Sequence, residues 1–185
     1  MARTVAAVAA WILTVAWMVT IFMFSAQPAE QSSEISASVT EMLIAAITPD
    51  FDQLSVAEQQ QLIENWHDII RKIAHLTEYA VLGVLLTVSL VLSRVKLCLS
   101  AIWAAGVSLL YAASDEIHQM FIESRGPGIV DVGIDFVGAL IGITFVWLGY
   151  KWFSCIAKNK KKSPNNPLTF ARLSYIISEC QKTTH

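Results

Sequence analysis

Charged residues and cysteines are both scarce in this sequence. Only 15% of its 185 residues are Asp, Glu, Lys or Arg, whereas 55% are hydrophobic and the mean hydropathy is +0.52. Soluble domains carry about 25% charged residues, so this composition excludes an ordinary soluble domain. The formal net charge is −2. Because a basic excess is missing, we expect no nucleic-acid partner.

The three cysteines, Cys98, Cys155 and Cys180, lie far apart in the sequence. They form neither a close pair nor a spacing typical of a metal site. We therefore expect reduced cytoplasmic thiols and no disulfide framework. The sequence also contains no nucleotide or coenzyme loop, so we expect no cofactor.

Four long apolar runs make up much of the chain, at residues 4–24, 73–93, 97–114 and 133–152. Each holds about twenty residues, enough for a helix to cross about 30 Å of hydrocarbon. The first run exceeds the apolar core of a signal peptide, and we expect it to be retained as a span. The predicted fold is an all-α, polytopic membrane bundle of four transmembrane helices.

A polar and acidic segment, residues 25–72, separates the first two runs. Apolar residues at helical spacing predict one amphipathic helix that ends before Pro49. The sequence from Ser55 to Glu58 is a capping box that predicts the start of a second helix. We expect both short helices to lie along the membrane surface or to cover the bundle, or to be plain connectors.

The basic residues indicate the orientation of the chain. Ten of the 13 Lys and Arg residues lie at the N-terminus, between the second and third runs, or in the C-terminal tail, and fourteen of the 15 acidic residues lie on the other side. The positive-inside rule therefore places both termini in the cytoplasm. We divide the chain into a transmembrane domain, residues 1–157, and a basic, polar cytoplasmic tail, residues 158–185.

Ionisable residues recur near the outward ends of the last three runs. Arg71, His75 and Glu78 have the spacing of one helical face. At 1.5 Å per residue, Glu78 lies about 24 Å above Arg94, and Asp135 lies about 24 Å above Lys151. We therefore expect these two carboxylates at matching depth, slightly below the outer surface.

Small residues should let these helices approach one another closely. The third run carries a stripe of small and polar residues, and the fourth contains the GxxxG pair Gly138 and Gly142. We infer a polar pocket that opens outward among the last three spans. The stripe consists of Ala101, Ala105, Ser108, Ala112, Asp115 and Gln119. The predicted pocket residues are Arg71, Lys72, His75, Glu78, Tyr79, Asp115, Glu116, His118, Gln119, Arg125, Asp131 and Asp135.

Several roles are open to these residues. Arg71 and Arg125 could hold a phosphate or carboxylate headgroup, or they could only neutralise neighbouring carboxylates and lock the bundle. The pairs His75/Glu78, Asp115/His118 and Asp131/Asp135 have spacings that could hold a metal ion. Two nearby arginines and Lys72 would repel a cation, so we expect no bound metal. If the protein is an enzyme, we expect Glu78, Asp135 and His75 to carry acid–base catalysis.

Four motifs follow one another in a specific order. They are Phe24-Ser-Ala-Gln-Pro-Ala-Glu-Gln-Ser-Ser, Arg71-Lys-Ile-Ala-His75-Leu-Thr-Glu78-Tyr79, Asp115-Glu116-Ile-His118-Gln119-Met-Phe121, and Arg125 followed by Asp131 and Asp135-Phe-Val-Gly138. With these motifs the chain resembles the VanZ-like family of bacterial membrane proteins. The resemblance implies a multi-pass protein of the bacterial cell membrane associated with resistance to the glycopeptide antibiotic teicoplanin.

We therefore expect a protein that contributes to glycopeptide resistance or envelope homeostasis. It would do so by binding an anionic envelope component, such as a lipid-linked cell-wall precursor or a glycopeptide, in the outward pocket. The alternative is a membrane-embedded hydrolase or transferase acting on a phosphate- or acyl-bearing envelope lipid. Membrane lipids are the expected partners, and the sequence predicts no oligomeric state.

Overall fold

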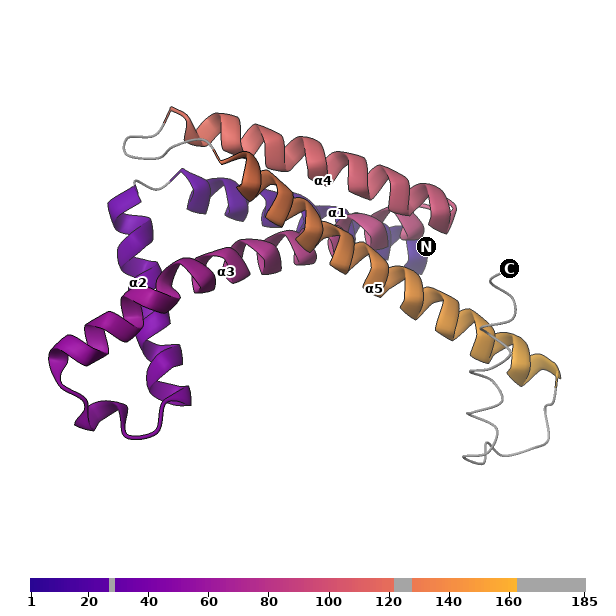
Figure 1. Cartoon of the computed structure of the whole chain (residues 1–185). Helices are drawn as coiled ribbons and strands as arrows, with labels where there is room; N and C mark the ends of the chain where they lie inside the picture. The colour runs from indigo at the N-terminus through magenta and orange to yellow at the C-terminus, as the bar shows by residue number, and fades with distance from the viewer. Residues whose placement is uncertain (27–28, 122–127, 163–185) are drawn as a thin grey trace. The chain divides into compact units, whose positions relative to one another are not determined.

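The structure is a computed structural model that describes residues 1–26, 29–121 and 128–162, with side chains for 1–26, 37–121 and 128–157. These ranges contain helices and no strand (Figure 1). The elements are α1 (Ala2–Ser25), α2 (Ala29–Ile47), η1 (Phe51–Gln53), α3 (Val56–Leu92), α4 (Leu97–Gln119) and α5 (Ile129–Lys162). Of these, α1, α3, α4 and α5 are long and apolar enough to cross a membrane. The predicted all-α bundle of four spans is confirmed.

Helix α3 is longer than the sequence analysis predicts. The short helix expected after the capping box and the span expected at residues 73–93 form one continuous helix of 37 residues. Its first turn is capped by Ser55 and Glu58, each of which donates its backbone N–H to the side chain of the other. No glycine or proline interrupts the sequence between Val56 and Leu82. A helix of this length spans about 55 Å, so its N-terminal half extends beyond the hydrocarbon core, where it packs against α2.

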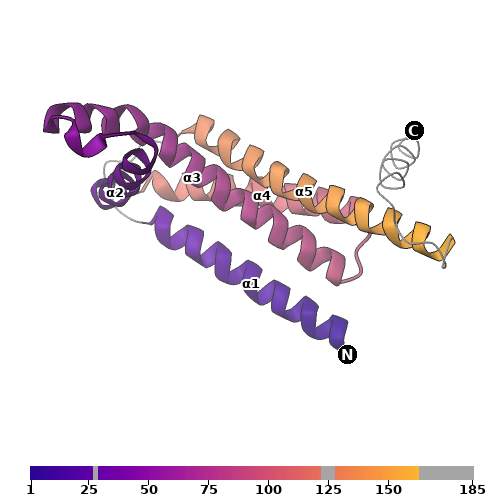
Figure 2. The same cartoon turned by 90° about the horizontal axis from the view of Figure 1, so that it is seen from below.

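Helices α1 and α3 pack side by side and run in opposite directions (Figures 1 and 2). The indole N–H of Trp17 donates to the backbone oxygen of Glu78 over 2.9 Å. One turn earlier in α1, the hydroxyls of Thr14 and Ser89 lie 3.0 Å apart. The Arg3 guanidinium donates to carbonyl groups at the C-terminus of α3. Residues nearer the N-terminus of α1 therefore contact residues nearer the C-terminus of α3, as in any antiparallel pair of helices.

Helices α1 and α4 run in the same direction. The Tyr111 hydroxyl donates to the backbone oxygen of Met18 over 2.6 Å. The Gln119 amide donates to the Ser25 hydroxyl over 2.9 Å. The residue numbers of the contacts therefore increase together in the two helices. The second pair, Ser25 and Gln119, lies at their C-terminal ends.

Helices α3 and α5 also run parallel and approach closely through glycine. A Cβ atom at Gly138 would collide with the backbone oxygen of Leu76, and one at Gly142 would collide with that of Ala80. Such close backbone contact is what small residues permit between membrane helices. The predicted role of the glycine pair in helix packing is confirmed.

The stripe of small and polar residues on α4 faces protein, with one shift. Ser108, Ala112, Asp115 and Gln119 are buried as predicted. Near the start of the helix, Ala101 and Ala105 are only partly buried, and the preceding residues Ser100 and Ala104 are fully buried instead. Near the N-terminus of α4, the buried face is therefore shifted by one residue from the predicted stripe.

The chain forms two compact units, Met1–Ile143 and Thr144–His185. All helix contacts above belong to the first unit. In the second, the Lys151 ammonium lies 5.0 Å from the centroid of the Trp147 ring. Among the described cysteines, Cys98 is free and exposed, but Cys155 is disulfide-bonded. The expectation of reduced thiols is therefore wrong for Cys155. The boundary between residues 157 and 158 stays a prediction.

Candidate functional site

Four helix segments meet at one end of the first unit. They are the C-terminus of α1, the middle of α3, the C-terminus of α4 and the start of α5. Because α1 and α4 run one way and α3 and α5 run the other, the register of their contacts brings these segments to the same level. Three of them, in α3, α4 and α5, carry the ionisable residues that the sequence analysis selected.

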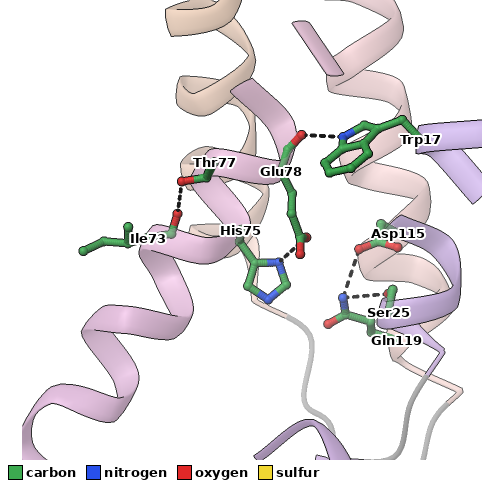
Figure 3. A network of polar contacts seen from close by, with 8 residues as sticks. All are labelled: Trp17, Ser25, Ile73, His75, Thr77, Glu78, Asp115 and Gln119. Carbon is green, nitrogen blue, oxygen red and sulfur yellow. Dashed lines mark hydrogen bonds and ion pairs between the residues drawn. The ribbon is translucent and has the colours of Figure 1, made fainter. Parts of the chain in front are cut away.

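The contribution of α3 is a partly exposed pair of ionisable side chains. His75 Nδ1 lies 3.9 Å from Glu78 Oε2, and the two side chains are 33% and 26% exposed. They are three residues apart and therefore share a helix face. In Figure 3 both side chains lie on the side of α3 that looks toward Asp115, Ser25 and Gln119. The pair thus lies between the surface of the bundle and the buried groups of α4.

The contribution of α4 is a buried hydrogen-bond network. The Gln119 amide nitrogen donates to Asp115 Oδ2 over 3.0 Å and to the Ser25 hydroxyl over 2.9 Å (Figure 3). One helical turn separates Asp115 from Gln119, so a single amide can join both partners. The ring of His118 stacks on Phe22 of α1, with ring centroids 4.6 Å apart. This end of α4 is thus fixed to α1 by polar and aromatic contacts.

The contribution of α5 is the buried carboxylate of Asp135. It is 2% exposed and interacts electrostatically with Asp115 and Glu78. The Tyr79 side chain is fully buried and interacts electrostatically with Asp115, Asp135 and Glu78. We call Glu78, Tyr79, Asp115 and Asp135 the inner cluster. Its members come from three different helices.

The inner cluster contains polar atoms without partners. Among the described side chains, the buried atoms Tyr79 Oη, Asp115 Oδ1 and Asp135 Oδ1 form no hydrogen bond. The buried Ser108 Oγ and His118 Nε2 share this property. Most buried polar groups in proteins have a partner, because an unsatisfied one costs about 1–3 kcal/mol. Three such oxygens in one cluster depart from this usual pairing.

Two further acidic side chains, Glu116 of α4 and Asp131 of α5, lie near the start of α5. The Gly128 backbone N–H donates to Glu116 Oε2 over 2.9 Å, which ties the start of α5 to α4. Asp131 is half-buried and donates its backbone N–H to the Gly128 oxygen. Both residues interact electrostatically with Asp135. Glu116 thus has a structural contact, and it adds negative charge beside the inner cluster.

The basic residues of the predicted pocket lie elsewhere. Arg71 is half-buried and pairs with Asp68, with 4.0 Å between Nη2 and Oδ1. Lys72 is exposed. Arg125 lies outside the described residues. The described interior is therefore acidic apart from His75 and His118, which both interact electrostatically with Asp115.

Sequence reasoning found the ionisable members of this site but missed some of their partners. Ser25, Trp17 and Phe22 all belong to α1 and contact the other helices. Ser25 lies within the Phe24-Ser-Ala motif, and this motif could have marked it as a member of the site. No arrangement of three or more His, Cys, Asp or Glu that could hold a metal ion occurs within the described part of the chain.

This fold and site define a multi-pass α-helical membrane protein with a buried polar cluster at one end of its bundle. The chain belongs to the VanZ/LLP1 family, whose sequence profile matches residues 10–151. The resemblance inferred from the four motifs is confirmed, and the matched range includes every predicted pocket residue. No curated protein and no solved structure matches the chain.

Proposed function

We propose that this protein binds the headgroup of an anionic cell-envelope component at the end of the bundle that carries the inner cluster. The supporting observation is the convergence of buried, partly unpartnered polar groups from α3, α4 and α5. A charged group costs roughly 2.5–3.5 kcal/mol at mid-bilayer and less toward the interface, and ionisable groups within a membrane span usually mark a functional site. A structural role alone would favour complete pairing, which Asp115 and Asp135 lack.

The location and orientation belong to the same proposal. The protein would lie in a bacterial cell membrane with both termini cytoplasmic and the inner cluster near the outer surface. Arg3, Arg94 and Lys96 support this orientation, because they lie at the α1, α3 and α4 ends opposite the cluster. The cluster would then face the leaflet in which lipid-linked cell-wall precursors and glycopeptides meet.

The anion would contact the rim of the site. Arg71 and Lys72 are exposed enough to reach a phosphate or carboxylate, and His75 lies one turn closer to the inner cluster. A headgroup held there would be less available to a glycopeptide of the teicoplanin type, or the glycopeptide itself would be held. Either route would contribute to resistance or to envelope homeostasis.

One observation favours a second candidate function, catalysis on a phosphate- or acyl-bearing envelope lipid. His75 and Glu78 form a partly exposed pair beside the buried Asp135. Such a pair could move a proton to or from a lipid headgroup as a hydrolase or transferase requires. In this case Glu78, Asp135 and His75 would be the acid–base residues.

A complementation experiment separates the two functions. The gene is deleted and replaced by the wild type, Arg71→Ala, Glu78→Gln or Glu64→Gln, and teicoplanin susceptibility and the envelope lipid profile are measured. Glu64 is the matched control for Glu78, because it lies in the exposed N-terminal half of the same helix. Membrane abundance of each variant is checked by immunoblot.

Binding predicts that Arg71→Ala lowers resistance while the lipid profile stays that of the wild type. Catalysis predicts that deletion changes the lipid profile and that Glu64→Gln restores it whereas Glu78→Gln does not. A deletion strain with unchanged susceptibility and an unchanged lipid profile would contradict both candidates.

A further inference from the structure

We infer that the inner cluster binds a primary ammonium group, so that the headgroup held by this protein is zwitterionic. The ammonium would lie among Tyr79, Asp115 and Asp135, and the anionic part of the same headgroup would lie toward His75 and the rim. The inference rests on the proposed headgroup binding and specifies its chemistry. An aminophospholipid and a soluble phosphorylated amine both carry this pair of groups.

The number and kind of unpartnered atoms carry the inference. Tyr79 Oη, Asp115 Oδ1 and Asp135 Oδ1 are three buried oxygens without a hydrogen-bond partner. These three residues are 0%, 4% and 2% exposed. An –NH₃⁺ group brings three N–H donors and no acceptor, which matches three oxygen acceptors. A quaternary ammonium brings no donor and would leave all three oxygens unsatisfied.

The charge around Asp135 also favours a cation. Within the described part of the chain, Asp135 interacts electrostatically with Tyr79 and with the carboxylates of Asp115, Glu116, Asp131 and Glu78. The described basic groups near the cluster, His75 and His118, act on Asp115. An anion placed among these carboxylates would be repelled, whereas an ammonium group would relieve their mutual repulsion.

A route into the cluster exists along α3. Asp115 and Asp135 are buried, but the side chains of His75 and Glu78 are about one-third and one-quarter exposed. Figure 3 shows both on the side that looks toward Asp115 and Gln119. A headgroup that enters past Glu78 would place its ammonium in the inner cluster. Its anionic part would then lie beside His75, one turn away on the same helix face.

Phospholipids that differ only in their headgroup test this inference. The full chain is purified in detergent, and lipid binding is quantified by native mass spectrometry with phosphatidylethanolamine, phosphatidylcholine and phosphatidylglycerol of identical acyl chains. The first two carry the same phosphate and differ in N–H donors. We expect phosphatidylethanolamine to bind about tenfold more tightly than phosphatidylcholine, the factor that corresponds to one charge-assisted hydrogen bond.

Three variants locate the effect. Asp115→Asn and Asp135→Asn each remove one acceptor charge and should reduce the preference for phosphatidylethanolamine to about threefold or less. Asp52→Asn is the matched control, because Asp52 is an exposed carboxylate in η1, and it should keep the full preference. Circular dichroism and size-exclusion chromatography verify that each variant is folded.

The outcomes distinguish this inference from the function on which it rests. Equal binding of phosphatidylethanolamine and phosphatidylcholine by the wild type would overturn the inference, and tight binding of phosphatidylglycerol alone would do the same while leaving the proposed function intact. Binding of none of the three would overturn both for lipid headgroups.

If free phosphoethanolamine competes with the lipid and phosphocholine does not, the ammonium contact is supported and a soluble source suffices. A preference without this competition supports the lipid as the source.

Discussion

The hydroxyl of Tyr111 joins two membrane helices through one short hydrogen bond. It donates to the backbone oxygen of Met18 over 2.6 Å, at a level where the surroundings are apolar. Hydrogen bonds between membrane helices contribute modestly, since the separated helices also find partners. The bond nevertheless fixes the register of α4 on α1, which in turn sets the level of Gln119 and Ser25.

We expect Tyr111→Phe to lower the free energy of unfolding by about 1 kcal/mol, because the Met18 oxygen loses its added donor while the ring stays in place. Thermal unfolding in detergent micelles, followed by circular dichroism, measures the change. Tyr150→Phe is the matched control, since the Tyr150 side chain is exposed, and it should leave the transition where it is. A transition that shifts equally in both variants would show that the Met18 contact is not the cause.

The carboxylate of Glu116 acts at the start of α5. Its Oε2 accepts the Gly128 N–H, and the residue is 7% exposed. We expect Glu116→Ala to destabilise this junction by about 1–3 kcal/mol, because a backbone N–H loses its acceptor. Hydrogen exchange at the first turn of α5, measured by mass spectrometry, should become faster.

Two variants control this prediction. Glu116→Gln keeps an oxygen that can accept from Gly128 and should retain most of the protection. Glu41→Ala removes an exposed carboxylate on α2 and should leave α5 unchanged. If Glu116→Gln exchanges as fast as Glu116→Ala, the negative charge matters more than the hydrogen bond.

At the scale of single residues, sequence periodicity predicted which ionisable side chains share a helix face. Asp115 and Gln119 lie on one face because helical spacing requires it, and both are buried. Periodicity within one helix cannot predict a partner on another helix. Ser25 was therefore missed, as its contact with Gln119 depends on the register between α1 and α4. The ion pair of Arg71 with Asp68 was missed because several rotamers of so long a side chain fit the sequence pattern.

At the scale of helices, the contact between α3 and α5 depends on three positions without a Cβ atom. Gly138 and Gly142 of α5 meet the backbone of α3, and Gly83 of α3 meets the backbone of Ala139. Glycine thus contributes from both helices, and the two backbones pack closely. This contact sets the level of Asp135 relative to Tyr79, with which it interacts electrostatically, and is therefore a condition for the inner cluster.

We expect Gly142→Ala to destabilise the protein by about 1–3 kcal/mol, because its methyl group would collide with the Ala80 backbone oxygen and force the helices apart. Gly106→Ala is the matched control. A Cβ at Gly106 meets nothing within 4 Å, and alanine is the better helix former by about 1 kcal/mol. The two substitutions should therefore shift the unfolding midpoint in opposite directions. A stabilising Gly142→Ala would show that α3 and α5 are not in close contact there.

Sequence patterns predicted the four spans well but not the extent of α3. A run of about twenty apolar residues marks a span by length alone, so the four runs were found with boundaries within a few residues for α1 and α4. The capping box at Ser55 correctly marked a helix start. The polar residues that follow were read as a separate helix, because a change in composition resembles a boundary. The backbone has no reason to break there, and one helix results.

At the scale of the whole chain, the surface of the bundle matches a membrane protein. Large hydrophobic side chains are exposed along the spanning helices, Ile12, Trp103 and Leu110 among them. In water this would be an aggregation-prone surface, whereas in a bilayer it contacts lipid tails. The interior carries polar groups, which include Thr14, Ser89 and Ser108. The apolar surface and polar interior reverse the arrangement of a soluble protein. The composition of the sequence already indicates this, because it has too few charged residues to cover the surface of a soluble bundle.

The orientation of the chain is open to a direct test with cysteine labelling. In intact cells, a membrane-impermeant maleimide should label Gln53→Cys in a Cys98→Ser background, since Gln53 lies in η1 next to the protruding half of α3. The native Cys98 is free and exposed beside Lys96, and it should react only after permeabilisation. Peptide mass mapping identifies the labelled cysteine. We expect this pattern because the positive-inside rule would keep Arg3, Arg94 and Lys96 in the cytoplasm. The reverse pattern would place the inner cluster on the cytoplasmic side, where it could not meet a headgroup of the outer leaflet, and the proposed function would fail while the helix packing would be unaffected.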